Sequence, residues 1–445
     1  MHNAAQADGG RGPEEVFCRR VTVVGLGRFG GGVGVTRWLC RQGARVTVSD
    51  QAPADKLARS VQALEGLDVT LHLGGHEKGD FTEADLLVVN PAVPKDMPLL
   101  AAADAAGVPR TTEINLFIER CPAPIIGVTG TVGKSTTTAM LGAILACRHE
   151  THVGGNIGRS LLEELETIRP EHVVVLELSS FQLEDLPLIG FGPHVAVVTN
   201  LAPNHLDRHG TMEAYAAAKR NICRFQGPED VLVLNGACEA TAAWRGPGRT
   251  VFFDPDAAPF DLAIPGRHNQ ANAQAAWTAA ELLGVARAEA ADVLGAFPGL
   301  PHRLRFVAER GGARYYNDSK CTTPEGAIVA LEAFDPGRTV IILGGYDKGV
   351  GFDALAAVAC ERAKAVVALG ATRDRIAAAV EACRTGDSPT VDLADSLAEA
   401  IRLAAARSEA GDAVLLSPAC ASYDMFNNYE QRGDRFQRIV AQLAP

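Results

Sequence analysis

The chain alternates short, continuously apolar runs with Ala- and Leu-rich stretches that suit helices. The runs fall at residues 21–24, 173–178, 195–199, 231–234, 339–343, 365–369 and 413–416. Strands that are apolar on both faces need helices above and below them, which is typical of parallel sheets. The alternation therefore predicts an α/β fold of mostly parallel sheets flanked by helices.

One of these strands opens into a Gly-rich turn. Residues 125–129 lead into Gly130-Thr131-Val132-Gly133-Lys134-Ser135, and a helical stretch follows from Thr136. In such a turn the backbone N–H groups bind phosphate, the lysine reaches the β- and γ-phosphates, and the serine hydroxyl reaches Mg²⁺. Val128 replaces the first Gly of the strict motif, so the turn is a variant. It still predicts a nucleoside triphosphate site.

A second Gly-rich turn, Gly25-Leu-Gly27-Arg-Phe-Gly30, follows the run at residues 21–24. Asp50 ends the next strand, about 20 residues on, where the dinucleotide fingerprint has an acid for a ribose hydroxyl. The same turn can hold any diphosphate at a helix N-terminus, so NAD binding is one of two interpretations. The extra glycines at positions 31, 32 and 34 weaken the NAD interpretation.

Two Pro-rich segments, residues 119–124 and 297–303, indicate joints between domains. A helical stretch near residues 114–120 moves the first boundary earlier. After a disordered tail at residues 1–17, we predict three domains. These are a Rossmann-like N-terminal domain (18–112), a central P-loop-type mononucleotide-binding ATPase domain (113–300) and a C-terminal Rossmann-like domain (301–445).

The composition limits the possible partners and the compartment. A formal net charge of -11 argues against nucleic acid and against an anionic membrane surface. No apolar run reaches the roughly 18 residues of a membrane span, and the N-terminus has no apolar signal core. The ten cysteines form no CxxC pair, which favours reduced thiols over disulfides. We expect a cytoplasmic protein.

Two candidate metal ligands follow central strands. Glu177 lies near the end of the run at residues 173–178, and His205 follows the run at 195–199. Ligands of open α/β sheets bind at this edge, so both residues suit a metal site. Each is also typical of an ordinary cap or surface position. Lys219, by pattern alone, is a helix-surface lysine.

Taken together, these segments resemble the Mur ligase family. The resemblance rests on the phosphate loop, on Gly154–Gly158, on Glu177-Leu-Ser-Ser-Phe-Gln-Leu-Glu184, on Asn204-His-Leu-Asp-Arg208, on Gly266-Arg-His-Asn-Gln-Ala-Asn272 and on Pro301-His-Arg303. It runs in order from about residue 21 to the C-terminus. It implies a UDP-sugar rather than NAD in the first domain.

The resemblance also implies roles for single residues. Lys134, His205 and Lys219 would be catalytic, Lys219 as a carbamate. Two Mg²⁺ ions would be held by Ser135, Glu177, His205 and carbamylated Lys219. ATP would contact Gly130, Thr131, Gly133, Lys134, Ser135, Thr136, Asn269, Asn272, His302, Arg303 and Asp318. The UDP-sugar would contact Gly25, Asp50, Asn156 and Ser179. Val132, Asn204 and the run Gly30–Gly34 depart from the usual family pattern.

Three motifs of the last domain follow apolar strands and suggest the second substrate. They are Tyr316-Asn-Asp318-Ser-Lys320-Cys-Thr322, Leu343-Gly-Gly-Tyr-Asp-Lys348, and a C-terminal segment with Ser422 and Tyr429. Lysines and hydroxyls at one sheet edge suit a dicarboxylate amino acid. The motifs resemble the D-glutamate-adding branch of the family, which implies that Lys320, Thr322, Lys348, Ser422 and Tyr429 serve D-glutamate.

The resemblance implies the reaction as well. The alanine carboxylate of UDP-N-acetylmuramoyl-L-alanine would attack ATP to give an acyl phosphate, and the amine of D-glutamate would then displace phosphate. We expect a monomer without nucleic-acid or membrane partners. The alternatives are a relative with another amino-acid substrate, a folate-glutamating ligase, and a non-catalytic UDP-sugar- or NAD-binding protein. The residues that precede Gly130 speak against the folate enzyme.

Overall fold

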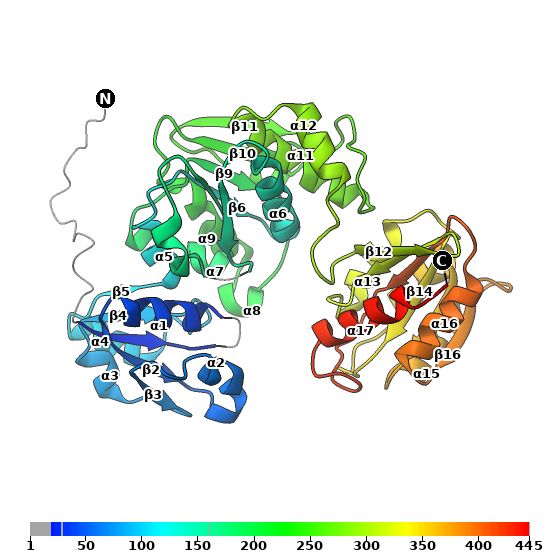
Figure 1. Ribbon diagram of the computed structural model, residues 1–445, viewed down its shortest axis with the longest axis horizontal. Helices are drawn as coiled ribbons and strands as arrows, with labels where there is room; N and C mark the ends of the chain where they lie inside the picture. The colour runs from blue at the N-terminus through cyan, green and yellow to red at the C-terminus, as the bar shows by residue number, and fades with distance from the viewer. Residues whose placement is uncertain (1–18, 28–29, 159, 445) are drawn as a thin grey trace. The chain divides into compact units, whose positions relative to one another are not determined.

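The computed structural model describes residues 19–27, 30–158 and 160–444, so the predicted tail at 1–17 lies outside the described residues. The chain forms two compact units. The first extends to Pro255 and includes Ala275–Val285, and the second contains Asp256–Gln274 and Ala286 onward. Figure 1 labels many of the helices and strands of both units.

The first sheet of the first unit is parallel throughout, in the order β3-β2-β1-β4-β5. Its strands are β1 (Arg20–Val24), β2 (Arg45–Asp50), β3 (Val69–Leu73), β4 (Leu86–Val89) and β5 (Arg110–Thr111). Its helices are α1 (Gly31–Arg41), η2 (Ala54–Leu57), α2 (Ala58–Gln62), α3 (Lys78–Thr82) and α4 (Pro98–Ala105). The strand order changes direction between β1 and β4, which is where open α/β sheets bind ligands.

The second sheet of this unit has the order β11-β10-β9-β6-β8-β7 and is also parallel. Its strands are β6 (Ile125–Thr129), β7 (Thr151–Gly155), β8 (Val173–Glu177), β9 (Val195–Val198), β10 (Val231–Asn235) and β11 (Arg249–Phe253). The helices are α5 (Glu113–Ile118), α6 (Lys134–Leu145), η3 (Leu161–Glu163), η4 (Leu165–Thr167), α7 (Ser180–Leu183), η5 (Leu186–Leu188), α8 (Leu206–His209), α9 (Met212–Arg224) and α10 (Glu239–Ala242). β6 lies between β8 and β9, so their carboxyl ends meet.

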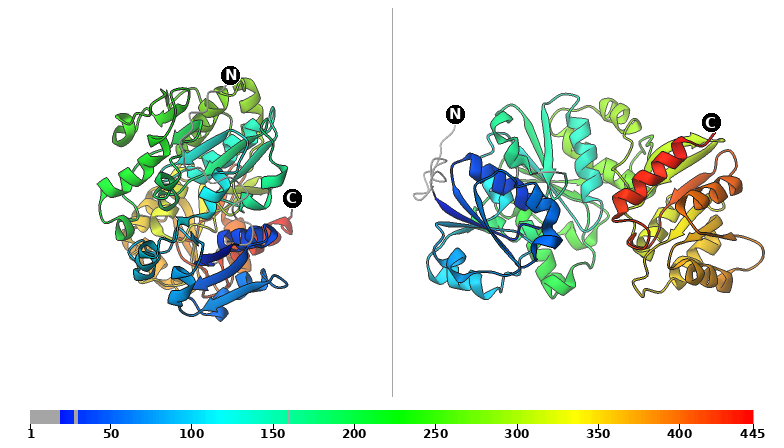
Figure 2. Two further views of the ribbon diagram at one scale, coloured as in Figure 1. Left: turned by 90° about the vertical axis from the view of Figure 1, so that its left-hand side faces the viewer. Right: turned by 60° about the horizontal axis from the view of Figure 1, so that its bottom comes forward.

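The third sheet, in the second unit, has the order β12-β13-β17-β14-β15-β16. Its strands are β12 (Arg305–Arg310), β13 (Ala313–Asn317), β14 (Thr339–Gly344), β15 (Ala363–Leu369), β16 (Thr390–Ala394) and β17 (Ala413–Leu416). The helices are α13 (Pro324–Glu332), α14 (Asp353–Arg362), α15 (Arg373–Cys383), α16 (Leu397–Arg407) and α17 (Tyr429–Ala441), and α11 (Arg267–Glu281) and α12 (Arg287–Gly295) precede the sheet. Figure 2 shows α17 lying along this sheet.

One pair in the third sheet is antiparallel. β12 and β13 form a hairpin whose turn, Gly311-Gly312, has φ values of 57° and 76°. Positive φ at both central residues is the conformation that two-residue hairpins favour, and glycine adopts it without strain. The remaining pairs of the sheet are parallel, so the prediction of mostly parallel sheets is confirmed.

The apolar runs predicted as strands become the buried centres of the three sheets. β8 and β14, for example, are buried at every position, as a strand covered by helices on both faces must be. The α/β fold with three sheets is therefore confirmed. The domain limits at residues 112 and 300 stay predictions.

Candidate functional site: a phosphate loop and an adjoining cavity

The phosphate loop joins β6 to α6, and its glycines have conformations that other residues avoid. Gly133 caps α6 in the left-handed region with φ 84°. Gly130 has φ 153°, and a Cβ atom there would lie 1.9 Å from Thr199 Oγ1. The loop therefore presents backbone rather than side chains, and its amides lie at a helix N-terminus that favours anions. Lys134 begins the helix, and its ammonium donates to Thr131 O over 2.9 Å.

Thr199 and Asn200 directly follow β9, and their side chains hydrogen-bond to this loop. Neither residue was predicted from the sequence as part of the site. The amide of Asn200 accepts from the backbone N–H of Thr131 (3.2 Å) and of Val132 (3.0 Å) and donates to Val132 O (3.0 Å). Thr199 Oγ1 donates to the same carbonyl over 2.7 Å. Val132 itself is 64% exposed, so the side chain that departs from the family pattern lies outside these contacts.

We expect Asn200→Ala to raise the KM for ATP about tenfold, because the loop loses three hydrogen bonds that hold its shape. Asn200→Asp keeps the oxygen acceptor but loses the N–H donor. Its KM for ATP should lie between those of Asn200→Ala and the wild type. Asn221→Ala, which removes a bond to Leu183 O far along the chain, is the control. Steady-state kinetics in ATP check this. An unchanged KM in Asn200→Ala would show that the loop keeps its shape unaided.

Lys219 is buried beneath the loop rather than on a helix surface. Its side chain on α9 is 1% exposed, and Nζ donates to Gly130 O over 2.8 Å. Burial and the nearby Lys134 lower the pKa of Lys219 to about 7, while Glu177 opposes them. The interpretation of Lys219 as an ordinary surface lysine, based on pattern alone, is therefore wrong.

Glu177 ends β8 beside this lysine and is 1% exposed. Asn156 Nδ2 donates to its Oε1 over 2.8 Å. Its other oxygen, Oε2, is buried and has no hydrogen-bond partner among the described residues. A buried carboxylate oxygen without a donor is costly unless a cation completes it. A carboxylate oxygen such as Glu177 Oε2 is the kind of ligand that Mg²⁺ prefers.

His205 caps α8 in the left-handed region, with φ 53°. Burial, then the ammonium of Lys134, lowers its pKa, which favours the neutral imidazole that can bind a metal. Its ring contacts Phe181, with the centroids 5.1 Å apart. Phe181 also stacks on His209, which lies 3.1 Å from a Glu184 carboxylate oxygen. His209 was not predicted from the sequence as a site residue. Its ring packs against Phe181 and so helps to hold the Phe181 ring beside His205.

A cavity of about 910 Å³ lies beside this cluster within the first unit. All four residues predicted to contact the UDP-sugar line it: Gly25, Asp50, Asn156 and Ser179. Further lining comes from both sheets of the unit. The structure therefore brings the predicted UDP-sugar residues together, and Asn156 joins them to Glu177.

The acid of the dinucleotide fingerprint already has partners. Asp50 Oδ2 accepts from the backbone N–H of Gly27 over 3.1 Å, and Oδ1 accepts from Ala52 N over 2.8 Å. Asp50 thus holds the turn after β1. Ser179 similarly caps α7 through Gln182, in a capping box. Both residues shape the cavity wall as well as line it.

The unusual glycines at the start of α1 have a steric reason. A Cβ on Gly32 would lie 2.2 Å from Leu26 O, and one on Gly34 would lie 2.5 Å from the Ser160 side chain. The helix therefore packs directly against the turn after β1 and against the segment before η3. The run permits this close packing and does not itself identify a ligand.

The remaining predicted ATP residues belong to the second unit. Asn269 and Asn272 are buried on α11, and Asn269 donates to Pro265 O over 2.7 Å. His302 is buried with φ 59°, and Arg303 beside it is half-buried. Burial raises the pKa of Asp318 to about 7, and its two oxygens accept from Ser417 Oγ and Leu304 N. Their contact with ATP stays a prediction.

The five residues predicted to bind the amino acid lie at the carboxyl ends of strands in the third sheet. Lys320 and Thr322 follow β13, Lys348 follows β14, and Ser422 and Tyr429 follow β17. Lys320 and Lys348 are exposed, and Ser422 is buried. Lys320 Nζ lies 5.7 Å from the centre of the Tyr429 ring. The sheet therefore gathers cations and hydroxyls at one edge, as predicted.

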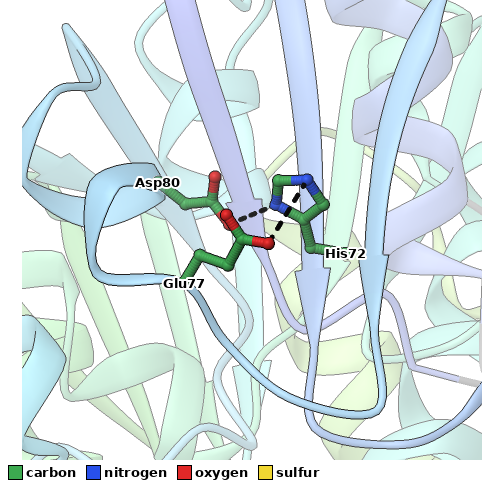
Figure 3. A group of neighbouring side chains, drawn as sticks. All are labelled: His72, Glu77 and Asp80. Carbon is green, nitrogen blue, oxygen red and sulfur yellow. Dashed lines mark hydrogen bonds and ion pairs between the residues drawn. The ribbon is translucent and has the colours of Figure 1, made fainter.

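A separate His–carboxylate cluster joins β3 to α3 (Figure 3). His72 Nδ1 lies 2.7 Å from Asp80 Oδ2, and Nε2 lies 3.9 Å from Glu77 Oε1. Three such groups could hold a metal. However, His72 Nδ1 is already hydrogen-bonded to Asp80, and the Glu77 side chain is 70% exposed. The geometry is that of an ion pair that ties the edge strand to the helix.

The hydrogen bond to Asp80 raises the pKa of His72. Because the pKa of His72 is higher in the folded state, protonated His72 stabilises the fold. This stabilisation is complete at pH values below the unfolded-state pKa of about 6.5, and it disappears as the pH rises through the folded-state pKa. We expect His72→Gln to lower the free energy of unfolding by about 0.5 kcal/mol at about pH 5.5 and by less at about pH 8.5. Urea denaturation at both pH values measures this. An equal loss at both would contradict the assignment.

The fold and the phosphate loop together place the chain among α/β proteins that bind a nucleoside triphosphate, and a cavity lies beside the loop. Family models match in order: a MurD-like N-terminal domain of Mur ligases (19–111), the Mur ligase middle domain (128–250) and the Mur ligase glutamate ligase domain (302–420). The chain belongs to the Mur ligase family, whose members depend on ATP and typically on Mg²⁺.

Two relatives named UDP-N-acetylmuramoylalanine–D-glutamate ligase are similar along almost their whole length. The one from Roseiflexus sp. is 42% identical and covers 95% of this chain and 98% of the relative. The one from Symbiobacterium thermophilum is 40% identical and covers 96% and 98%. The solved structure of UDP-N-acetylmuramate-alanine ligase MurC from Thermotoga maritima has a TM-score of 0.60 at 20% identity, covering 95% of this chain and 99% of its own. That likeness concerns the fold.

In the described part of the chain, none of the helices combines the length and the hydropathy needed to cross a bilayer.

Proposed function

We propose that this protein is an ATP-dependent ligase that adds D-glutamate to UDP-N-acetylmuramoyl-L-alanine, in the cytoplasmic synthesis of a peptidoglycan precursor. The names of its full-length relatives support the substrate pair. The observation that carries the proposal is the cluster at the phosphate loop. There Lys134, Lys219 and Glu177 lie beside a cavity that is large enough for a nucleotide-sugar.

The reaction has two steps. An oxygen of the alanine carboxylate attacks the γ-phosphorus of ATP, and the bond to the β-phosphate oxygen breaks, which releases ADP. The amine of D-glutamate then attacks the acyl carbon of the acyl phosphate. The amide bond forms, the bond to the phosphate oxygen breaks, phosphate leaves, and the amine loses a proton. Lys134 and the loop amides stabilise the negative charge that gathers on the transferred phosphoryl group.

Two metal ions would neutralise further charge on the phosphates and on the attacking carboxylate. Ser135 and Glu177 would hold the first, because the described part of the chain offers the buried Glu177 Oε2 no hydrogen-bond donor. His205 and Lys219 would hold the second. The lowered pKa values of both residues support their role, since a metal ligand must be unprotonated.

Carbamylation of Lys219 follows from the same environment. A lysine whose pKa is about 7 has a large neutral fraction at physiological pH, and only the neutral amine reacts with carbon dioxide. The carbamate would exchange a buried cation for a carboxylate-like anion. That exchange removes the repulsion between Lys219 and Lys134 and provides an oxygen ligand for Mg²⁺.

The nucleotide-sugar would occupy the cavity of the first unit. Gly25 lies at the end of β1, where its backbone can approach a diphosphate closely. Asp50 shapes that turn, while Asn156 and Ser179 lie on the wall near Glu177. This arrangement would direct the alanine carboxylate toward the phosphate loop. D-Glutamate would bind at the edge of the third sheet through Lys320, Thr322, Lys348, Ser422 and Tyr429. That the chain acts as a monomer stays a prediction.

The test is ADP release by the full chain with ATP, Mg²⁺, UDP-N-acetylmuramoyl-L-alanine and a panel of amino acids. We expect release that depends on D-glutamate, with L-glutamate, D-aspartate and meso-diaminopimelate far less effective. Preference for another amino acid would overturn the substrate assignment. No release with any of them would favour a non-catalytic sugar-nucleotide-binding protein.

A further inference from the structure

Arg432 is a charged side chain that is buried in the second unit. It lies on α17 and is 1% exposed. The preceding residues, Glu430 and Gln431, are polar, so the local sequence does not indicate a buried position. It is among the largest fully buried side chains of the described residues. Burial lowers its pKa to about 10, so the guanidinium is still a cation at neutral pH.

The guanidinium bonds to two of the segments predicted to bind the amino acid. Its Nε donates to Ser319 Oγ over 3.0 Å and its Nη2 to Ser319 O over 2.8 Å. Its Nη1 donates to Cys420 O over 3.0 Å and to Ala421 O over 3.3 Å. Ser319 directly precedes Lys320, and Ala421 directly precedes Ser422. One planar group thus fixes both segments to each other.

The third predicted binding segment meets the other two at the same point, and so does Tyr429. A Cβ on Gly345 would lie 3.2 Å from Arg432 Nη1, and Tyr346 N donates to Ala421 O over 2.8 Å. These residues begin the segment that carries Lys348. Tyr429 lies one turn earlier on the helix of Arg432, and its carbonyl accepts from Ser319 Oγ over 2.8 Å. All three segments therefore meet around the guanidinium.

The charge of Arg432 lacks a close counter-ion. Its four acceptors are neutral, and among the described residues no carboxylate lies within ion-pair distance of it. Asp424 and Asp318 act on it only at longer range. A buried cation held by neutral groups is costly for the fold. An anionic ligand bound to the segments around it would reduce that cost.

We propose that Arg432 is a positioning residue for the amino-acid substrate: it holds the three binding segments together and favours an amino acid whose side chain carries a carboxylate. This inference rests on the proposed function for the identity of the acid. Lysine cannot replace Arg432, because a single ammonium cannot reach three carbonyls and a hydroxyl in one plane. The charge and the fork geometry can therefore be separated by substitution.

The test compares Arg432→Lys, Arg432→Gln and the matched control Arg435→Lys, an exposed arginine on the same helix. ADP release gives the KM for each substrate. We expect Arg432→Lys to raise the KM for D-glutamate about tenfold or more, and Arg432→Gln to raise it about hundredfold. The KM values for ATP and for UDP-N-acetylmuramoyl-L-alanine should stay within about twofold of wild type. Arg435→Lys should change none of the three.

A folded Arg432→Lys variant with an unchanged KM for D-glutamate would overturn the inference, as would equal losses for all three substrates. If neither variant folds, NMR of the wild type decides. The guanidinium Nε–H resonance of Arg432 should shift when D-glutamate binds, and an unmoved resonance would count against the role. If the wild type prefers another amino acid, the proposed substrate fails, and the KM for that acid tests Arg432 in the same way.

Discussion

Replacing Lys134 with alanine is expected to lower the turnover number about a thousandfold or more. Lys134 starts α6 at the phosphate loop, where its ammonium donates to Thr131 O, and in the proposed reaction this ammonium holds the γ-phosphoryl group. Charge on that group rises in the transition state, so removing the ammonium affects the chemical step more than binding. Steady-state ADP release measures the loss.

Two controls separate this effect from damage to the fold. Lys78→Ala, at an exposed position that begins α3, should keep wild-type turnover. Lys134→Ala should still bind UDP-N-acetylmuramoyl-L-alanine with wild-type affinity in calorimetry, because the cavity does not include Lys134. Full turnover in Lys134→Ala would refute the assignment of the phosphate loop.

The Lys219→Ala variant should lose about a hundredfold to a thousandfold in turnover, and a short carboxylic acid such as acetate or formate should restore part of it. The side chain is buried under Gly130, so alanine leaves a space close to the loop. A small carboxylate in that space would supply the oxygen ligand that a carbamate provides. Turnover measured against the concentration of added acid checks the rescue.

Lys219→Arg and Arg220→Ala are the comparison variants. Arginine keeps a cation but cannot form a carbamate, so Lys219→Arg should lose activity and gain nothing from acetate. Arg220 is exposed on the next position of α9, and its substitution should leave turnover unchanged. Equal activity of Lys219→Arg and the wild type would show that carbamylation is not required.

Much of the fold follows from local sequence patterns. Continuous apolar runs predicted β1, β8, β9, β10, β14, β15 and β17, because a strand buried on both faces leaves few positions for a polar side chain. The Gly-rich turn before Lys134 predicted the phosphate loop from backbone chemistry alone. Strands at sheet edges are harder to recognise. β3 is half-exposed, and β7 contains His152 and two glycines, so neither has a buried pattern.

The site residues that escaped prediction act through tertiary contacts. Asn200 follows a strand in the ordinary sequence Thr-Asn-Leu, and only the fold brings its amide to the phosphate loop. Arg432 lies in a polar stretch that suits a solvated helix face, and the loops that follow β13 and β17 bury it. For Lys219, the local pattern and the family resemblance led to different predictions. Its pattern predicted a surface lysine, whereas the family resemblance predicted a catalytic carbamate that holds a metal ion.

The central claim is that ATP activates the alanine carboxylate, and oxygen-18 transfer tests it most directly. UDP-N-acetylmuramoyl-L-alanine labelled with oxygen-18 in its carboxylate is incubated with the protein, ATP, Mg²⁺ and D-glutamate, and the released phosphate is analysed by mass spectrometry. An acyl phosphate route transfers one labelled oxygen from the carboxylate to each phosphate, because the bond to the acyl carbon breaks in the second step. Labelled phosphate is the predicted result. Phosphate that carries no label while the amide product accumulates would contradict the account.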